Sequence, residues 1–216
     1  MTTTALQRAI GRAAARRSDS VERCGLCTAV VSAVHRHVLD GLDGSVMCAC
    51  PACALLFGER ASRTYKHSAR ETAGGDRYHL IPRGRTRLAD IATDALNVPV
   101  GLAFFVRQAD GQVLAHYPSP LGTTQSQVDP DAWRELERGS PPIEAMKPRV
   151  EAYLVRISGA PGLSALAARP GRDEHWIVPV DDCFRLVAVI RRHWTGMAGG
   201  SDVWREVARF FADLDG

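Results

Sequence analysis

The sequence predicts an α+β protein in which a small N-terminal β-hairpin module precedes a mixed or antiparallel sheet with packed helices. Two C-x-x-C pairs lie near the N-terminus, at Cys24/Cys27 and Cys50/Cys53. Apolar runs that are typical of strands follow further along the chain, separated by turn signals. The last forty residues contain two stretches with the periodicity of an amphipathic helix.

Composition places the chain among ordinary globular proteins. Its 216 residues suffice for one or two domains with a proper core. A net charge of +3 is too small to favour nucleic-acid binding. No apolar run approaches the roughly 20 residues of a membrane span, and the N-terminus, with its scattered arginines, does not resemble a secretory signal. We therefore expect a cytoplasmic protein without a membrane span.

Changes in composition divide the chain into four segments. Residues 1–20 are rich in Ala and Arg and predict a basic, mobile arm, which is either solvated or docked on an acidic partner. Residues 21–58 contain the cysteine pairs. Residues 59–79 are polar and predict a linker. Residues 80–216 carry the remaining strand and helix patterns and predict an α+β domain.

The cysteine module has the pattern of a β-hairpin. Residues 28–40 favour a strand, "GLDG" at 41–44 is a turn signal, and 45–47 predict a short return strand. The apolar residues of the segment 54–60 can pack against this hairpin. The hairpin would return the chain so that the second cysteine pair meets the first.

Four strands are expected in the larger domain. Residues 100–107 and 112–118, separated by "QADG", predict a second hairpin. Residues 150–157 and 175–180 are apolar strands that could pair with each other.

Three helices are expected beside these strands. Residues 129–139 predict a helix capped by Asp129. The run 181–194 predicts a helix capped by Asp181 or Asp182, and 201–214 predict another, capped by Ser201 or Asp202. The apolar residues of the second helix recur along one stripe, which should face the core.

The paired cysteines predict a tetrahedral metal site. A C-x-x-C loop places two sulfurs on one side of a tight turn, and two such loops complete a four-sulfur site. In a reducing compartment this spacing favours metal ligation over disulfides. The predicted ligands are Cys24, Cys27, Cys50 and Cys53, with Pro51 stiffening the second loop.

Three neighbouring residues have open roles. Cys48 is either a spare buried residue or a replacement for Cys50 as ligand. His35 and His37 alternate along a predicted strand, so both should face the same side. They either pack on the hairpin, orient a ligand sulfur or replace a cysteine.

The predicted metal is zinc, with iron as the alternative. The pairs "CGLC" and "CPAC" resemble the knuckles of zinc ribbons and of rubredoxins. Rubredoxins surround their iron with aromatic side chains, whereas Phe57 is the only Phe, Tyr or Trp within residues 21–58. Four protein sulfurs leave no open coordination position, which indicates a structural role or, with iron, electron transfer.

The densest candidate catalytic group lies near the C-terminus and contains His175, Asp181, Asp182, Cys183 and His193. Cys183, near the start of a predicted helix, could act as a nucleophile. The two aspartates would disfavour its thiolate, and the helix pattern turns it towards the core. An enzyme centred on Cys183 is therefore an alternative, and a non-enzymatic protein is the expectation.

Basic residues alternate at Arg83, Arg85 and Arg87. They could bind phosphate or an acidic partner, or form a solvated face. The small net charge favours the solvated face.

Several segments resemble an uncharacterised bacterial family that is common in actinobacteria: "CGLC", "CACPACALLF", "HWIVPVDDCFRLV" and "RRHWTG". The resemblance extends from about residue 21 to the end. Members of that family are often encoded beside [NiFe]-hydrogenase structural and maturation genes. The resemblance implies a metal-binding accessory protein whose partners are hydrogenase subunits or maturation factors, and it assigns no residue a role.

Overall fold

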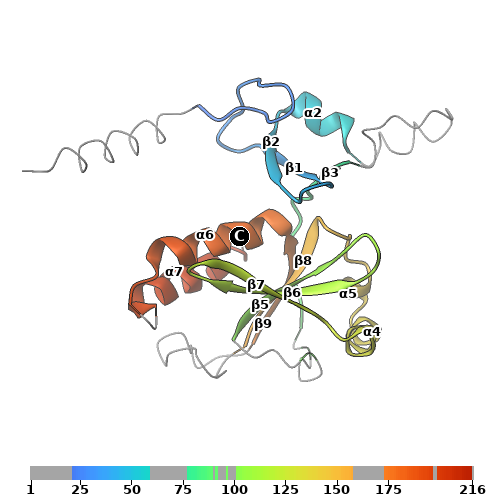
Figure 1. Ribbon diagram of the computed structural model, residues 1–216, viewed down its shortest axis with the longest axis vertical. Helices are drawn as coiled ribbons and strands as arrows, with labels where there is room; N and C mark the ends of the chain where they lie inside the picture. Colours follow the sequence, from blue (N-terminus) through green and yellow to red (C-terminus); the bar gives the residue numbers. More distant parts are fainter. Residues whose placement is uncertain are drawn as a thin grey trace, which may run out of the picture. The chain divides into compact units, whose positions relative to one another are not determined.

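The computed structural model shows the chain as two compact units, residues 1–80 and 81–216 (Figure 1). The described residues are 21–58, 77–89, 91, 96, 101–157, 173–196 and 199–215. The α+β class predicted from the sequence is confirmed, because antiparallel sheets and helices occur together. The basic arm predicted for residues 1–20 lies outside the described residues.

The first unit is a three-stranded antiparallel sheet with one short helix. Strand β1 (Arg36–Asp40) lies in the centre, between β2 (Val46–Ala49) and β3 (Tyr78–Leu80). Helix α2 (Pro51–Leu56) follows β2 directly. The predicted hairpin is thus present, but its first strand begins at residue 36 rather than 28, because residues 28–31 belong to the first cysteine loop.

Strand β3 corrects the predicted linker, which included Tyr78 and His79. The N–H of Gly41 donates to the carbonyl of Arg77, and the guanidinium of Arg77 makes a bidentate contact with the buried carboxylate of Asp40. Two hydrogen bonds of this kind fix orientation as well as distance. Strand β3 was not predicted because the composition of its segment is polar, and specific side-chain contacts hold it in place.

The apolar core of this unit is small. Val38, Ala49 and Ala54 are buried together. The partly buried side chains packed against them are Leu26, Met47, Phe57 and Leu80. The expected packing of residues 54–60 on the hairpin is thus seen for Ala54 and Phe57. A core of this size stabilises a module only modestly, and small modules commonly need a disulfide or a metal in addition.

The second unit is built on a six-stranded antiparallel sheet of order β4-β9-β8-β5-β6-β7. Its strands are β4 (Thr86–Arg87), β5 (Leu102–Arg107), β6 (Val113–Ser119), β7 (Gly122–Gln127), β8 (Glu151–Arg156) and β9 (Glu174–Pro179). The predicted β5–β6 hairpin and the predicted pairing of β8 with β9 are both confirmed.

Strand β7 was missed because its sequence, "GTTQSQ", has no apolar alternation. It forms the edge of the sheet and pairs with β6 along its whole length, from Gly122 opposite Ser119 to Gln127 opposite Leu114. Edge strands are commonly polar, which protects them against pairing with other chains.

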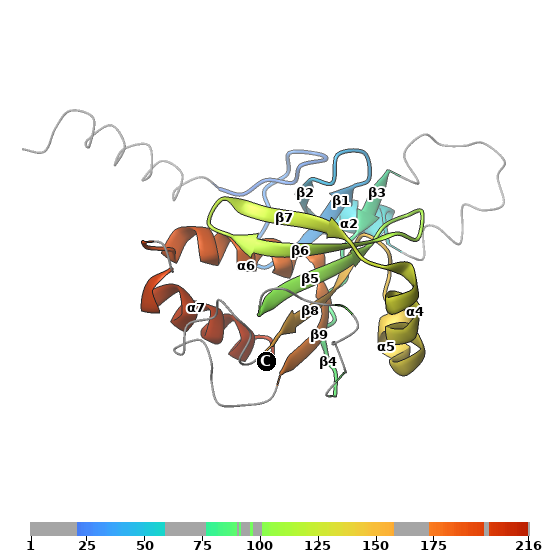
Figure 2. The ribbon, with the colours of Figure 1, turned by 60° about the horizontal axis from the view of Figure 1, so that its bottom comes forward.

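Helices cover the sheet of this unit (Figure 2). They are α4 (Pro130–Gly139), α5 (Pro141–Glu144), α6 (Val180–His193) and α7 (Gly200–Ala212). Trp133 and Ile143, from α4 and α5, share a buried cluster with Phe105 and Tyr153 of the sheet. Helices α6 and α7 pack together, and α6 contacts β6, β8 and β9. The sheet therefore forms the centre of the core.

The predicted helices are confirmed, and one predicted cap is correct. The carboxylate of Asp129 accepts hydrogen bonds from the N–H groups of Asp131 and Ala132, as an N-cap does. Helix α6 instead begins at Val180, immediately after β9, so the caps predicted at Asp181 or Asp182 were wrong. The chain passes from strand to helix without a loop, and both aspartates lie within the first helical turn.

The cap of α7 was also predicted wrongly. It is Gly199, with a φ of 87°, rather than Ser201 or Asp202. Glycine adopts this left-handed conformation without steric cost. Ser201 and Asp202 therefore fall inside the helix.

Candidate metal centre

Four cysteines of the first unit come together: Cys24, Cys27, Cys50 and Cys53. Their sulfur atoms all lie within 4.8 Å of one another, and Sγ of Cys27 lies 3.6 Å from Sγ of Cys50. A disulfide would need a separation of about 2.05 Å. A tetrahedron with metal–sulfur bonds of about 2.3 Å has edges of about 3.8 Å. The four sulfurs are therefore close enough together to bind one metal ion.

The first pair is held by a tight loop. The N–H of Thr28 donates to the carbonyl of Cys24 at 2.9 Å, and the N–H of Cys24 donates to the carbonyl of Ala29 at 2.8 Å. Thr28 has a φ of 62°, which is uncommon for a β-branched residue. An isolated antiparallel bridge between Arg23 and Val30 closes the loop. The backbone thus turns sharply enough to place both sulfurs on one side.

Gly25 allows this loop to lie directly against β2. Its N–H donates to the carbonyl of Cys48 at 2.8 Å. A Cβ atom at this position would lie 2.9 Å from Cβ of Met47, closer than real side chains approach. Gly25 was not predicted to be part of the site, although a glycine between two cysteines is a signal for such a contact.

The second pair lies at the start of α2. Cys50 is the N-cap, and its sulfur accepts a hydrogen bond from the N–H of Cys53 at 3.5 Å. Pro51 occupies the first helical position, where its fixed φ suits the helix and its missing N–H costs nothing. The helix was not predicted from the sequence, because cysteine is not a usual N-cap residue.

The four thiols differ in acidity before any metal binds. Burial raises the pKa of Cys24, but hydrogen bonds from the backbone of Cys50, Leu26 and Cys27 outweigh it and lower that pKa to about 6. The N–H of Cys53, followed by the thiol of Cys27, lowers the pKa of Cys50. Burial and the neighbouring thiols raise the pKa of Cys53 to about 12. A metal ion would displace the remaining protons, since thiolates are the ligating form.

The centre is largely enclosed. Cys24, Cys50 and Cys53 are buried, whereas Cys27 is exposed. The partners packed against the buried sulfurs are aliphatic side chains and a further thiol: Val31, Leu26 and Cys48. The donor set fits a metal ion that prefers four thiolates. With all four bound, no coordination position would stay open for a substrate.

Cys48 belongs to a second group of possible ligands. Together with His35 and His37 it forms a set whose ligand atoms also lie within 4.8 Å of one another. The expectation that both histidines face the same side is correct, because their ring centroids lie 4.7 Å apart.

Three members of the candidate catalytic group are buried: His175, Asp182 and Cys183. Cys183 is completely buried in α6, and burial, together with the charges of Asp182 and Asp181, raises the pKa of its thiol. His175 is also buried, and its Nδ1 lies 2.7 Å from the hydroxyl of Tyr153. Neither side chain has access to a substrate, so both contribute to the interior of the second unit.

Two of the three alternating arginines form ion pairs. Arg85 makes two hydrogen bonds to the carboxylate of Asp182, and Arg87 lies 3.1 Å from the carboxylate of Asp215. Their charges are compensated within the second unit. These contacts disfavour the phosphate site that the sequence pattern allowed.

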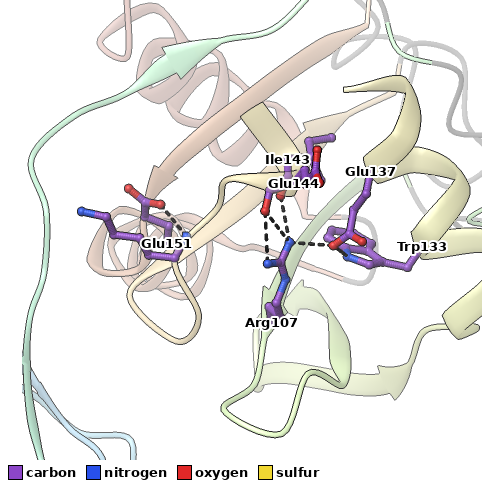
Figure 3. Close-up of polar contacts among 7 residues, drawn as sticks. Arg107, Trp133, Glu137, Ile143, Glu144 and Glu151 are labelled. Carbon is purple, nitrogen blue, oxygen red and sulfur yellow. Dashed lines mark hydrogen bonds and ion pairs between the residues drawn. The ribbon is translucent and has the colours of Figure 1, made fainter. Parts of the chain in front are cut away.

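A cavity of about 300 Å³ beside α4 is lined in part by Arg107. Figure 3 shows the polar contacts of this arginine. Its Nη2 donates to Oε1 of Glu137 at 2.6 Å and to the carbonyl of Ile143 at 3.0 Å. Nε1 of Trp133 donates to the same oxygen of Glu137. Arg107 therefore connects β5 to α4 and α5, and its charge is already compensated by Glu137.

None of the helices within the described residues is long and apolar enough to cross a membrane.

The sequence matches a protein family whose function is unknown. No curated protein and no solved structure is detectably similar to the chain. A family match covers residues 23–216, which includes all six cysteines, residues 23–80 of the first unit and the whole second unit. The chain therefore belongs to DUF5947, a family of unknown function.

Proposed function

We propose that the chain is a non-enzymatic accessory protein whose Cys24, Cys27, Cys50 and Cys53 hold one structural zinc ion. The observation that carries the proposal is the spacing of the four sulfurs, with 3.6 Å between Cys27 and Cys50. Four thiolates complete the coordination sphere, which is typical of structural zinc. The metal would stabilise a module whose apolar core is small.

The alternative is a rubredoxin-like iron centre that transfers electrons. Iron and zinc both accept four thiolates at similar distances, so the geometry does not separate them. The aliphatic surroundings of the cysteines, Leu26 and Val31, support zinc, because the aromatic shell expected around a rubredoxin iron is missing from this described cluster.

Elemental analysis and an absorption spectrum of the same freshly purified, reduced sample distinguish the two metals. Tightly bound zinc in a colourless solution agrees with the proposal. Bound iron with thiolate-to-iron charge-transfer bands would replace the structural role by electron transfer. Protein that retains neither metal would contradict both the zinc proposal and the iron alternative.

A surface next to the metal centre supports action through a protein partner. Leu55 and Leu56, adjacent residues of α2, are both exposed although they directly follow the second cysteine pair. Adjacent exposed leucines are more informative than single exposed apolar side chains, which are normal. The gene neighbourhood of the resembling family narrows the proposed partner to hydrogenase subunits or maturation factors.

Co-purification with tagged hydrogenase subunits and maturation factors tests the partner. The double variant Leu55→Gln/Leu56→Gln should keep its metal and lose most of the captured partner. The control is Leu121→Gln, which changes a leucine of the second unit that is even more exposed. Capture that is unaffected by the double variant, or that fails for every hydrogenase component, contradicts the proposed partner while leaving the metal site intact.

A further inference from the structure

A second set of potential metal ligands lies on the β1–β2 hairpin. His37 of β1 stands directly opposite Cys48 of β2 in the register of the sheet. His35 immediately precedes β1, two residues before His37, and the two rings meet edge to face at 67°. One ligand atom from each of the three residues lies within 4.8 Å of the other two. This set shares no residue with the four-cysteine group.

The hydrogen bonding of His35 fixes which ring nitrogen is available. Its Nδ1 lies 2.8 Å from the carbonyl oxygen of Ser32. A carbonyl only accepts hydrogen bonds, so Nδ1 carries the hydrogen and the neutral ring has its lone pair on Nε2. The carboxylate of Glu22 lies 3.6 Å from the same Nδ1, which also favours a hydrogen there. Metal-bound histidines are commonly oriented in this way, by an N–H donated to a backbone carbonyl.

The other nitrogen of His35 is buried without a hydrogen-bond partner among the described residues. The side chain is only 7% exposed, and its Nε2 is shielded from solvent. A buried polar atom without a partner is costly, and such atoms are rare in folded proteins. Nε2 therefore points to a ligand, and Cys48 and His37 supply the two further donors that a metal ion would need.

We propose that His35, through Nε2, together with His37 and Cys48, forms a second metal site for a divalent transition ion of the zinc type. Imidazole and thiolate together suit Zn²⁺ and related ions such as Co²⁺. Three protein ligands leave one position open to water or to a further donor, unlike the closed four-cysteine site. This second site is additional to the proposed function, and it does not depend on whether the four-cysteine site contains zinc or iron.

This assignment also explains the extra cysteine. Four sulfurs already complete the first site without Cys48, whose place in the sheet is opposite His37. Cys48 nevertheless packs against the buried sulfurs of the first site. The two proposed sites are thus neighbours within one module, and each has its own ligands.

Metal titration of the reduced full chain tests the second site. Protein carrying one equivalent of tightly bound metal is titrated with Co²⁺, and thiolate-to-cobalt charge transfer is followed. The wild type should take up a second equivalent. The variants His35→Gln and Cys48→Ser should bind that equivalent at least about 100-fold more weakly or not at all. Loss of a hydrogen-bond partner behind a ligand already costs about 10–100-fold, and loss of the ligand itself costs more. His193→Gln, a histidine change in the second unit, should behave like the wild type.

The first equivalent serves as the control for folding. If His35→Gln and Cys48→Ser retain it, their module is folded and the loss concerns the second site alone. A wild type that binds a single equivalent overturns the proposal, as does equal uptake of a second equivalent by both variants. Loss of the first equivalent in Cys48→Ser, with the second retained, would instead make Cys48 a ligand of the first site and contradict the assignment.

Discussion

Arg85 and Asp182 are separated by 97 residues in sequence and joined by two hydrogen bonds, from Nε to Oδ2 at 2.6 Å and from Nη2 to Oδ1 at 3.0 Å. The Asp182 carboxylate is buried, and Arg185 lies 3.2 Å from it as well. The pair fixes the segment before β4 to the first turn of α6. Removal of one partner from a buried pair leaves the other charge uncompensated.

Replacement Asp182→Asn should therefore destabilise the second unit by about 1–3 kcal/mol, less than for a fully buried pair because the Arg85 side chain is partly exposed. Urea unfolding followed by tryptophan fluorescence measures this unit alone, since all four tryptophans lie beyond residue 80. The control Asp131→Asn breaks an exposed pair with Arg134 and should cost less than about 0.5 kcal/mol. Equal effects of the two changes would disprove the structural role of Asp182.

Replacement Gly25→Ala should loosen the metal centre. The new methyl group would lie 2.9 Å from Cβ of Met47, so the first cysteine loop must shift away from β2. Such overpacking typically costs about 1–3 kcal/mol. We expect zinc release to excess chelator to become roughly tenfold faster, since each 1.4 kcal/mol corresponds to that factor.

Gly58→Ala is the matched control for this change. A Cβ at Gly58 would meet its neighbours at 3.5 Å or more, an ordinary van der Waals distance. Its zinc release should match the wild type. Similar release rates for Gly25→Ala and wild type would show that the loop does not depend on close approach to β2.

Acid should destabilise the second unit through His116. The ring of His116 stacks on Phe104, with ring centroids 4.6 Å apart. Burial lowers the pKa of His116 from 6.5 to about 4. The unfolded chain therefore takes up a proton at higher pH than the folded one. The contribution of the neutral ring to stability is complete above pH 6.5 and is lost as the pH falls towards 4.

The variant His116→Phe isolates this effect. Between pH 7 and pH 5 the wild type should lose on the order of 1 kcal/mol more stability than the variant, which keeps an aromatic stack and has no titrating group. Urea unfolding by tryptophan fluorescence at the two pH values measures the difference. Equal losses in both proteins would show that His116 does not titrate differently on folding.

Cysteine substitutions in the two units should have different effects, on metal content in the first unit and on stability in the second. Cys50→Ser removes a proposed metal ligand and the N-cap of α2, so the bound metal should be lost and the first unit should become sensitive to proteolysis. Cys183→Ala lies within the buried core of α6 and should cost about 1–2 kcal/mol in tryptophan-monitored unfolding, with zinc content unchanged. Loss of partner binding in Cys183→Ala, with a stable fold, would revive the alternative centred on Cys183.

The sequence predicts the parts of this structure that depend on local patterns. The β5–β6 hairpin, the pairing of β8 with β9 and the cap at Asp129 were all recognisable from turn signals and alternation. The start of α6 was not, because β9 continues into it without a loop and places Asp182 at the ion pair with Arg85. The role of Asp182 depends on its ion pair with Arg85, which is distant in sequence. A local sequence pattern cannot predict such a contact.

The same distinction applies to the metal centre. The spacing within each C-x-x-C pair indicated that Cys24, Cys27, Cys50 and Cys53 could converge, and the structure brings their sulfurs together. The group that includes Cys48 depends on cross-strand register, which places it opposite His37. Register follows from the turn and the packing of the hairpin, so the sequence could suggest that the histidines share a face but not which cysteine they meet.

X-ray absorption at the zinc edge of protein loaded with a single equivalent identifies the atoms that bind the ion in the four-cysteine centre. The Cys48→Ser variant is the preferred sample, because the second site then lacks a ligand and the ion occupies the four-cysteine centre alone. We predict a first shell of four sulfur atoms at about 2.3 Å. A first shell containing nitrogen or oxygen, or a variant that retains no zinc, would contradict the assignment of Cys24, Cys27, Cys50 and Cys53 as the ligands.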